Sequence, residues 1–253
     1  IKIKNKMISK NLLKQVSSYK QKKFRDQDNV FVVEGNKCVR ELLNSDFEIV
    51  SIFALESWIK ENKLANDNVF AVSEKELERM SNLSTPDKVL AVAKQKTFLK
   101  PNVQDLLTLV LDDISNPGNL GTIIRLATWF GIKNIVCSND TVECFNPKVV
   151  QATMGAIFHT NIFYTDIAKF LNTIDKSFPI YSTVLEGGKN IYKEKLTKEG
   201  LIIIGNESRG ISNQVKQKVN RPLTIPSFAE NKEVESLNAS IAAAIILSEF
   251  RRN

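Results

Sequence analysis

The chain has 253 residues, of which 43% are hydrophobic, enough for the core of two modest domains or one large one. Three cysteines without a CxxC pair and one histidine without a partner at ligand spacing argue against a metal site and a disulfide framework: Cys38, Cys137, Cys144 and His159. No apolar run reaches the roughly 18 residues of a membrane span, and no charged-then-apolar leader opens the sequence. We therefore expect a cytoplasmic protein without a metal or a membrane partner.

Positive charge is concentrated in the first part of the chain. The formal net charge is +7, and nine basic residues precede the first acid, Asp26: Lys2, Lys4, Lys6, Lys10, Lys14, Lys20, Lys22, Lys23 and Arg25. Residues 1–100 carry 19 basic and 13 acidic side chains, whereas residues 101–253 carry 16 and 15. Such an excess favours a nucleic-acid partner, because phosphate neutralisation supplies most of the sequence-independent affinity. The alternative is a lysine-rich surface that contacts only solvent.

Helix and strand patterns alternate in the first hundred residues. In chain order they predict a helix over 11–19, a strand over 31–33, a helix through Val39 and Leu43, strands over 49–55 and 69–72, a helix over 74–80 and a strand over 89–93. This alternation predicts a small α/β domain over residues 1–100. Lys100-Pro101-Asn102 is the expected linker, since proline disfavours helix on both sides of the joint.

A second α/β domain is predicted over residues 101–253. It opens with the strand 106–111, whose continuous apolar run is typical of the middle of a parallel sheet. The elements that follow are helix 122–130, strand 134–137, helix 147–155, strand 159–163, helix 167–174, strands 180–184 and 201–204, helix 213–219, strand 223–225 and helix 236–250. Pro147 at a first helical turn and Gly131 after a last one support two of these boundaries.

The segment Asn116-Pro117-Gly118-Asn119-Leu120-Gly121 joins a predicted strand to a predicted helix. Its two glycines allow a tight turn that exposes backbone amides, and Arg125 follows one turn into the helix, where its guanidinium can fork onto a phosphate. The segment matches neither GxxxxGK[ST] nor GxGxxG, so the usual nucleotide sites are unsupported. In the alternative interpretation Asn119 caps the helix and Arg125 is a surface charge.

Two further segments place polar residues near strand ends or helix starts. One of them follows an apolar strand and is Gly205-Asn206-Glu207-Ser208-Arg209-Gly210. Packing does not explain well why a carboxylate should lie between two glycines. In the alternative interpretation Glu207 caps the next helix. Ile225-Pro226 is followed by Ser236-Leu237-Asn238-Ala239-Ser240, in which Ser236 is the predicted N-cap and Asn238 lies in the first helical turn.

The three segments in this order resemble the three motifs of the SpoU/TrmH family of RNA 2′-O-methyltransferases. The resemblance covers residues 112–249, and the preceding residues, including 31–35, resemble the family's small RNA-binding N-terminal domain. It implies a C-terminal α/β knot domain of the SPOUT type with a deep trefoil knot, one of the rare exceptions to unknotted topology. It also implies that S-adenosylmethionine is held in a bent shape by loops of the knot, and that the protein is a homodimer whose sites take elements from both chains.

The resemblance also assigns roles to residues by position. The implied cofactor-binding residues are Thr183, Gly205, Asn206, Ile225 and Leu237, and the implied catalytic residues are Arg125, Asn119, Glu207, Ser236 and Asn238. Arg125 is the catalytic arginine, Asn119 is its loop partner, and the other three order the site or touch the RNA. Because a guanidinium rarely loses its proton, we expect Arg125 chiefly to anchor an RNA phosphate and orient the hydroxyl. A role as the base stays open.

One stretch departs from the family pattern. Residues 227–235, between Pro226 and Ser236, form a longer loop than usual and lack its glycine, which affects the expected cofactor contacts there. The predicted function is S-adenosylmethionine-dependent methylation of a ribose 2′-hydroxyl, with ribosomal RNA favoured over transfer RNA because of the N-terminal domain. A noncatalytic RNA-binding member and a base-nitrogen methyltransferase are the alternatives. No cysteine lies in a recognisable nucleophile motif.

Overall fold

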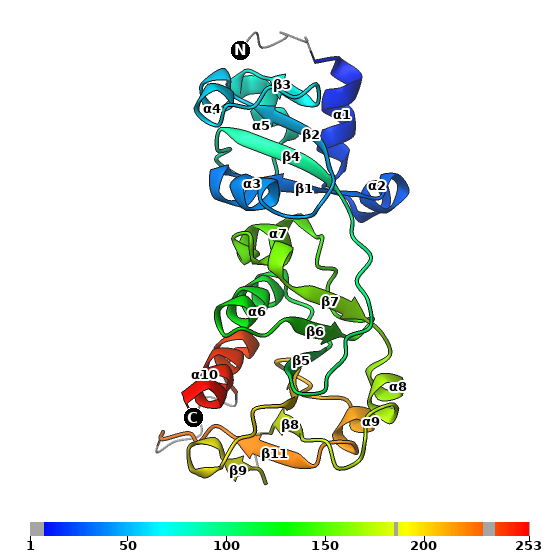
Figure 1. Cartoon of the computed structure of the whole chain (residues 1–253), viewed down its shortest axis with the longest axis vertical. Helices are drawn as coiled ribbons and strands as arrows, with labels where there is room; N and C mark the ends of the chain where they lie inside the picture. Colours follow the sequence, from blue (N-terminus) through cyan, green and yellow to red (C-terminus); the bar gives the residue numbers. More distant parts are fainter. Residues whose placement is uncertain (1–7, 185–186, 230–235, 253) are drawn as a thin grey trace. The chain divides into compact units, whose positions relative to one another are not determined.

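The computed structural model describes residues 8–184, 187–229 and 236–252. The chain forms two compact units (Figure 1). Unit 1 comprises residues 1–97 and 145–158, and unit 2 comprises residues 98–144 and 159–253. Among the described residues, no helix has the length and apolar character that crossing a membrane requires.

Unit 1 contains a four-stranded sheet in the order β1-β4-β2-β3. Its elements are α1 (Lys10–Ser18), α2 (Lys22–Asp28), β1 (Val30–Glu34), α3 (Asn36–Leu43), β2 (Ile49–Ala54), α4 (Glu56–Glu61), β3 (Val69–Ala71), α5 (Glu74–Met80), β4 (Val89–Lys94) and α7 (Pro147–Thr153). β4 pairs antiparallel with β1 and β2, and β2 pairs parallel with β3. The small α/β unit predicted from the pattern therefore forms, with α2 and α4 as additional short helices.

Helices α1 and α5 cover one face of this sheet. Val16 of α1 and Leu77 of α5 pack with Val32 and Leu90 of the sheet in one buried cluster. The start of α5 is fixed by a capping box, in which Ser73 accepts a hydrogen bond from the Glu76 amide and the Glu76 carboxylate accepts one from the Ser73 amide. The two helices are thus held against a common core, which sets their separation.

Helix α7 packs on β1 within unit 1, although the predicted division at residue 100 assigned it to the second domain. Aromatic contacts account for this grouping. The ring centroids of Phe31 and Phe145 are 4.5 Å apart, and those of Phe47 and Phe158 are 5.3 Å apart.

Unit 2 contains a seven-stranded sheet in the order β7-β6-β5-β10-β8-β11-β9, and every strand pair in it is parallel. Its elements are β5 (Leu107–Asp112), α6 (Pro117–Trp129), β6 (Asn134–Cys137), β7 (Asn161–Tyr164), α8 (Ile167–Asn172), β8 (Ile180–Thr183), β9 (Lys189–Asn190), η2 (Ile191–Lys193), β10 (Gly200–Gly205), α9 (Asn213–Lys216), β11 (Arg221–Thr224) and α10 (Ala239–Arg252). β5 is buried along its whole length, as its continuous apolar run predicts.

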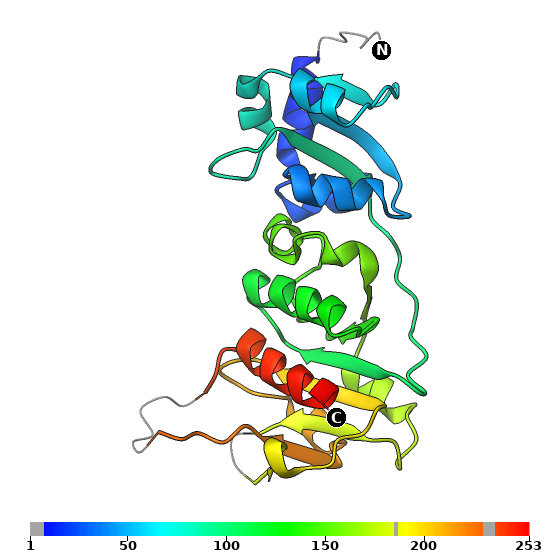
Figure 2. The same ribbon diagram turned by 60° about the vertical axis from the view of Figure 1, so that its left-hand side comes forward.

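Helices lie on both faces of this sheet. Phe170 of α8 and Val215 of α9 share a buried cluster with Val110 and Ile203 of the central strands. On the other face α10 packs beside α6, as both views show (Figures 1 and 2). Unit 2 is therefore the open α/β domain that the sequence predicts. The trefoil knot stays a prediction, because residues 185–186 and 230–235 of the loops after β8 and β11 lie outside the described residues.

Candidate active site

The motif segments of unit 2 meet at one edge of the parallel sheet. β5, β10, β8 and β11 are consecutive neighbours in the sheet and run parallel, so their carboxyl ends lie at the same edge. Thr183 ends β8, Gly205 ends β10, and Ile225 directly follows β11. Ligands of open α/β sheets bind at this edge, so the fold gathers three of the expected cofactor-binding residues where a ligand site is normal.

The first motif forms the start of α6 and not a loop before it. Asn116 is the N-cap, and its side-chain oxygen accepts hydrogen bonds from the amides of Gly118 (2.8 Å) and Asn119 (3.2 Å). The prediction that the helix begins at Thr122 is therefore wrong, as is the alternative in which Asn119 is the cap. An asparagine cap followed by Pro117 at the first helical position outweighs the low helix propensity of glycine. Two amides expected to be free for a phosphate are occupied by Asn116.

A chain of side-chain hydrogen bonds connects all three motifs. Asn119 is buried, its amide nitrogen donates to Glu207 Oε1, and its amide oxygen accepts from Asn238 Nδ2 at 3.0 Å. Asn119 and Asn238 are 119 positions apart in the sequence. We call Asn119, Glu207 and Asn238 the motif cluster. Glu207 thus binds a neighbouring amide and does not cap the next helix, whose N-cap is Ser212.

Asn238 also begins the last helix. Its side-chain oxygen accepts hydrogen bonds from Ser240 Oγ at 2.7 Å and from the amides of Ser240 (3.0 Å) and Ile241 (3.4 Å). The predicted N-cap, Ser236, lies outside the helix, exposed, and its hydroxyl donates to the backbone carbonyl of Glu207 at 3.4 Å. The cap is therefore Asn238, and Ser236 contacts the second motif instead.

The second motif is a tight turn organised by Asn206. Its backbone exchanges two hydrogen bonds with Gly210, of 3.0 and 2.9 Å, and its side-chain oxygen accepts from the Ser208 amide at 2.9 Å. At Gly205 a Cβ atom would lie 2.6 Å from both the Gly210 carbonyl oxygen and the Ile211 nitrogen, so no side chain fits. Asn206 and Gly205 therefore shape this turn, and any cofactor contact of Gly205 is made by its backbone.

Two acidic residues that the sequence interpretation did not single out anchor the same turn. Asp112 is buried at the end of β5 and accepts a hydrogen bond from the Ser212 amide at 2.7 Å. Asp113 has a left-handed φ of 61°, pairs with Arg209, and accepts a hydrogen bond from Asn206 Nδ2 (2.9 Å) on its carbonyl. The sequence signal that could have indicated both residues is an Asp-Asp pair directly after the apolar run 106–111. These contacts join the end of β5 to the turn after β10.

Arg125 stands apart from the motif cluster. It lies on the exposed side of α6 and forms no hydrogen bond or ion pair with any residue that the structure describes. Trp129, one turn further along the same helix, is 83% exposed. Within one chain the structure therefore brings Asn119, Glu207, Ser236 and Asn238 together and leaves Arg125 facing outward.

The edge also offers apolar surface to a cofactor. Ile225 and Thr183, at two strand ends, are half-buried, and Leu237, just before α10, is 45% exposed, so all three side chains are accessible. A ligand pocket of this kind combines apolar contacts with a few polar groups that fix orientation. The residues present therefore fit a purine-containing cofactor. Of the lengthened loop, Ser227, Phe228 and Ala229 are exposed, and residues 230–235 lie outside the described part of the chain.

Among the described residues, no histidine and no exposed thiol lies in the motif segments at this edge. Burial raises the pKa of the Cys38 and Cys137 thiols, and Cys144 is buried as well. His159 is exposed at the end of a short 3₁₀ helix (Ala156–His159), and the following strand begins at Asn161 and not at His159 as predicted. Within residues 8–184, 187–229 and 236–252, no group of three or more His, Cys, Asp or Glu side chains is arranged to hold a metal ion.

Comparison with known proteins agrees with this arrangement. The model of the SpoU rRNA Methylase family matches residues 106–248, and that of the MRM3-like substrate binding domain matches residues 10–91. The 23S rRNA (guanosine(2553)-2′-O)-methyltransferase RlmP of Bacillus subtilis is 25% identical over 94% of this chain and 100% of its own length.

Two solved structures share the fold over nearly the whole chain. A putative RNA methyltransferase of the TrmH family from Porphyromonas gingivalis is 33% identical, with a TM-score of 0.88 over 98% of this chain and 99% of its own. The AdoMet-bound rRNA methyltransferase from Sinorhizobium meliloti is 26% identical, with a TM-score of 0.83 over 96% and 95%. The α/β fold with a small preceding domain is thus that of SpoU/TrmH methyltransferases, and the chain belongs to the SpoU rRNA methylase family.

Proposed function

We propose that this protein methylates a ribose 2′-hydroxyl of ribosomal RNA with S-adenosylmethionine as the methyl donor. The observation that carries the proposal is the motif cluster, which joins all three family motifs at the carboxyl edge of the parallel sheet. Two relatives support the reaction and the cofactor. The Bacillus subtilis relative is named for 2′-O-methylation of a guanosine in 23S rRNA, and the Sinorhizobium meliloti rRNA methyltransferase is AdoMet-bound.

The cofactor site comprises Thr183, Gly205, Ile225 and Leu237. When bound there, S-adenosylmethionine supplies a methyl group on a positively charged sulfur. Ile225 and Leu237 provide apolar contacts, and Gly205 provides backbone next to a turn in which a side chain has no room. Asn206 acts indirectly, because its side chain and backbone are already bonded within the turn and to Asp113. It holds the turn in place.

The motif cluster positions groups and does not itself react. Both ends of the Asn119 amide are bonded to protein, so this side chain has a fixed orientation and orders the site. Glu207 and Asn238 fix the second motif and the start of α10 relative to α6. Arg125 anchors an RNA phosphate and orients the ribose hydroxyl, since its guanidinium presents a planar fork of donors that matches phosphate oxygens.

We further propose that the protein is a homodimer in which Arg125 of one protomer serves the site of the other. Arg125 faces outward, and large apolar side chains are exposed on the two helices that pack together: Trp129 of α6 (83%) and Ile241 of α10 (52%), with Leu237 (45%) just before α10. Exposed apolar side chains of this size mark interaction surfaces when they gather on one face. Light scattering of the native protein and of Trp129→Glu tests this, with a dimer and a monomer as the expected results.

The substrate assignment has alternatives that experiments separate. Calorimetric titration with S-adenosylmethionine distinguishes the enzyme from a noncatalytic RNA-binding member, which would show no binding. Mapping 2′-O-methyl positions in total RNA from cells with and without the gene identifies the RNA. We expect one ribosomal position to lose its methyl group. If every ribosomal position persists and a transfer RNA position vanishes, the substrate is transfer RNA.

A further inference from the structure

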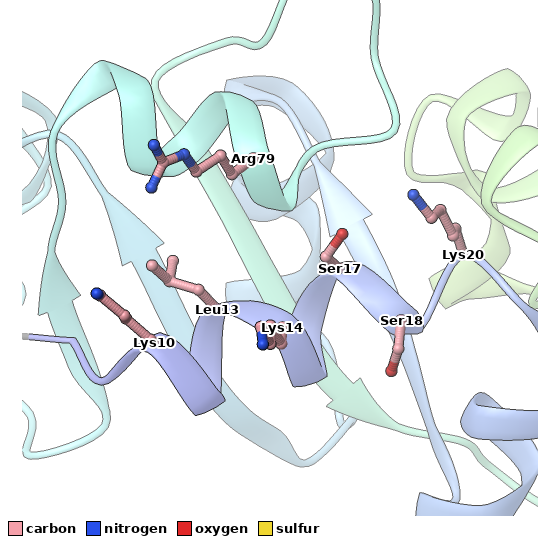
Figure 3. A pocket seen from close by; sticks show the side chains of 7 residues that line it. All are labelled: Lys10, Leu13, Lys14, Ser17, Ser18, Lys20 and Arg79. Atoms are coloured by element: carbon pink, nitrogen blue, oxygen red, sulfur yellow. The ribbon is translucent and has the colours of Figure 1, made fainter.

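A hollow of about 400 Å³ opens between α1 and α5 of unit 1 (Figure 3). We call it the α1–α5 groove. Most of its lining residues are cationic or hydroxyl-bearing: Lys10, Leu13, Lys14, Ser17, Ser18, Lys20 and Arg79. The groove has four cations and no acidic residue in its lining, so an anion is its natural ligand.

The spacing of α1 arranges the groove's donors in a row. Lys10, Lys14 and Ser17 stand at positions i, i+4 and i+7, which share one side of a helix. Successive members of such a row are about 4.5–6 Å apart along the axis, of the order of the separation of successive phosphates in a nucleic-acid strand. In Figure 3, Arg79 of α5 extends over α1 on the side to which Leu13 and Ser17 point. The Ser17 hydroxyl makes no hydrogen bond to the described residues and is free to donate.

Several other cations of unit 1 form ion pairs, whereas those of the groove form none with the described residues. Lys22 pairs with Asp26 at 2.6 Å, and Lys96 pairs with Asp46 at 2.6 Å. Lys10, Lys14, Lys20 and Arg79 form no ion pair with the part of the chain that the structure describes. Like charges at i and i+4, such as Lys10 and Lys14, slightly destabilise a helix by themselves. A bound polyanion removes that penalty.

Carboxylates near the groove are mostly engaged elsewhere. Asp28 accepts hydrogen bonds from Tyr19 and Gln15, and the Glu76 carboxylate is held by Ser73 in the capping box. α1 contains no acidic residue. Glu74 and Glu78 are exposed on α5, in the row adjacent to Lys75 and Arg79. The positive charge of the groove is thus opposed by few nearby anions.

A buried arginine lies at the C-terminal end of α1, where the helix dipole is negative. The last carbonyls of a helix carry partial negative charge and repel an anion. Here the Arg25 side chain, 1% exposed, donates to the carbonyls of Tyr19 (2.8 Å) and Lys20 (3.0 Å) at this end. Arg25 therefore both fixes the chain that leads to Lys20 and offsets the repulsion.

We propose that the α1–α5 groove binds the phosphodiester backbone of the RNA substrate without reading its bases. The inference that the ligand is RNA rests on the proposed function. The inference that the groove binds phosphate groups rests on the cationic lining of the groove itself. Its lining contains no aromatic ring for base stacking and no amide or carboxylate side chain for base edges, and three of its four cations are lysines, which bind phosphate as point charges, so the groove suits the backbone. The groove then adds affinity for the RNA and leaves the methyl-transfer step unchanged.

The test compares two double variants of the full-length protein that each remove two positive charges from unit 1. Lys14→Gln with Arg79→Gln alters the groove, and Lys60→Gln with Lys63→Gln alters α4 and the residues after it. The probe is a fluorescently labelled hairpin RNA, titrated at several salt concentrations, and circular dichroism checks that both variants are folded. We expect the groove variant to bind about 10-fold more weakly and the slope of log K against log salt to fall by about 1.4–1.8, while the control changes neither.

Methyl-transfer kinetics separate this inference from the proposed function. The groove variant should raise KM for ribosomal RNA with kcat and S-adenosylmethionine affinity unchanged, as expected for removal of uniform binding. Equal RNA affinity in the groove variant and the native protein overturns the inference and leaves the proposed function intact, and an equal loss in the control overturns it too. If the groove variant alone loses RNA affinity but the native protein methylates no RNA, the groove stands and the proposed function fails. Binding of polyglutamate as tight as that of RNA would make the partner an acidic protein and overturn the proposal.

Discussion

The motif cluster of unit 2 and the α1–α5 groove of unit 1 both gather polar side chains, but they hold them in opposite ways. In the motif cluster the buried Asn119 amide has a protein partner at each end, from the second and the third motif. In the groove four cations line an open hollow without an ion-pair partner among the described residues. One region fixes its side chains before the substrate arrives, and the other leaves its charges for a ligand to neutralise.

This difference follows from what each region has to do. Orienting a hydroxyl for attack requires groups placed to within a fraction of an ångström, which buried, mutually bonded side chains provide. Attracting a polyanion requires charge near the surface and little precision, and flexible lysines suffice. Changes in the motif cluster should therefore lower kcat, whereas changes in the groove should raise KM for RNA.

The largest effect is expected at Arg125, a predicted catalytic residue that is exposed and unpaired among the described residues, like a groove cation. Arg125→Ala should lower turnover at saturating RNA by roughly 1,000-fold, because orientation of reactants by bound groups supplies several kcal/mol. Arg125→Lys should also be impaired, since an ammonium lacks the planar fork. S-Adenosylmethionine affinity, measured by calorimetry, should not change. Arg252→Ala, an exposed arginine of α10, is the matched control. Near-normal turnover of Arg125→Ala would contradict this role and would mean that Arg125 only adds RNA affinity, as the groove lysines are proposed to do.

The next effect tests whether the turn after β10 is as tightly fixed as the motif cluster. Gly205→Ala places a Cβ atom against the backbone of Gly210 and Ile211, which must move. We expect a loss of about 1–3 kcal/mol in the free energy of unfolding, together with weaker S-adenosylmethionine binding. Gly118→Ala is the control, because its Cβ would meet only the Asn116 side-chain oxygen at 3.1 Å. Equal melting temperatures for the two variants would show that the turn is adaptable.

A smaller effect is expected from Glu207→Gln, which keeps the shape of the side chain and removes its charge. Hydrogen bonds to charged groups are stronger than neutral ones, so the bond from the Asn119 amide should weaken by about 1 kcal/mol. The methyl-transfer rate in single-turnover assays should fall by about 5-fold, and KM for RNA in steady-state assays should stay constant. Glu199→Gln is the control, because this half-buried carboxylate of the same unit also accepts a hydrogen bond, from the Asp105 amide, away from the motif cluster. A change in KM for RNA without a change in the methyl-transfer rate would mean that Glu207 adds RNA affinity, as the groove is proposed to do.

The smallest effect concerns the clamp at the end of α1. Tyr19 donates to the Asp28 carboxylate at 2.7 Å, and this hydrogen bond is the main cause that lowers the pKa of Asp28. Burial raises the pKa of Tyr19 to about 12, so the phenol keeps its proton at neutral pH. A lowered carboxyl pKa stabilises the fold at neutral pH, and this contribution is lost as pH falls through the lowered pKa.

Thermal unfolding of Tyr19→Phe against pH checks the clamp. The variant should melt below the native protein at pH 7, and the two curves should converge in acid, once Asp28 is protonated. The neighbouring Gln15→Ala, which removes the second hydrogen bond to Asp28, should give a smaller shift of the same sign. A difference that persists unchanged in acid would show that packing of the ring, and not the carboxylate, sets the stability at this end of the groove.

Local signals predicted most elements but not their contacts. Helix α5 has clear local signals, namely the capping residues Ser73 and Glu76 at its start and apolar spacing up to Met80. Pro147 marks the start of α7. The start of α6 was misplaced because two glycines were given more weight than the cap and proline before them. Short elements such as α2 and β9 lack a full period of apolar residues and were missed.

The residues of the site were predicted by family resemblance, whereas their arrangement required the fold. Nothing local indicates that Asn119 bonds to both Glu207 and Asn238, since strand order in a parallel sheet determines which loops meet. The same holds for Asp113, whose pairing with Arg209 spans two neighbouring strands. The basic start of the chain was evident from composition, but the groove needed the packing of α1 against α5.

The most direct test of the account is methyl transfer by the full-length protein to unmodified ribosomal RNA transcribed in vitro. S-Adenosylmethionine with a labelled methyl group is the donor, transfer RNA and Arg125→Ala are run in parallel, and the product is digested to nucleosides and separated. We predict a single labelled 2′-O-methylnucleoside from ribosomal RNA, absent with Arg125→Ala. Label on a base, or no label from either RNA by a protein that binds S-adenosylmethionine, would contradict it.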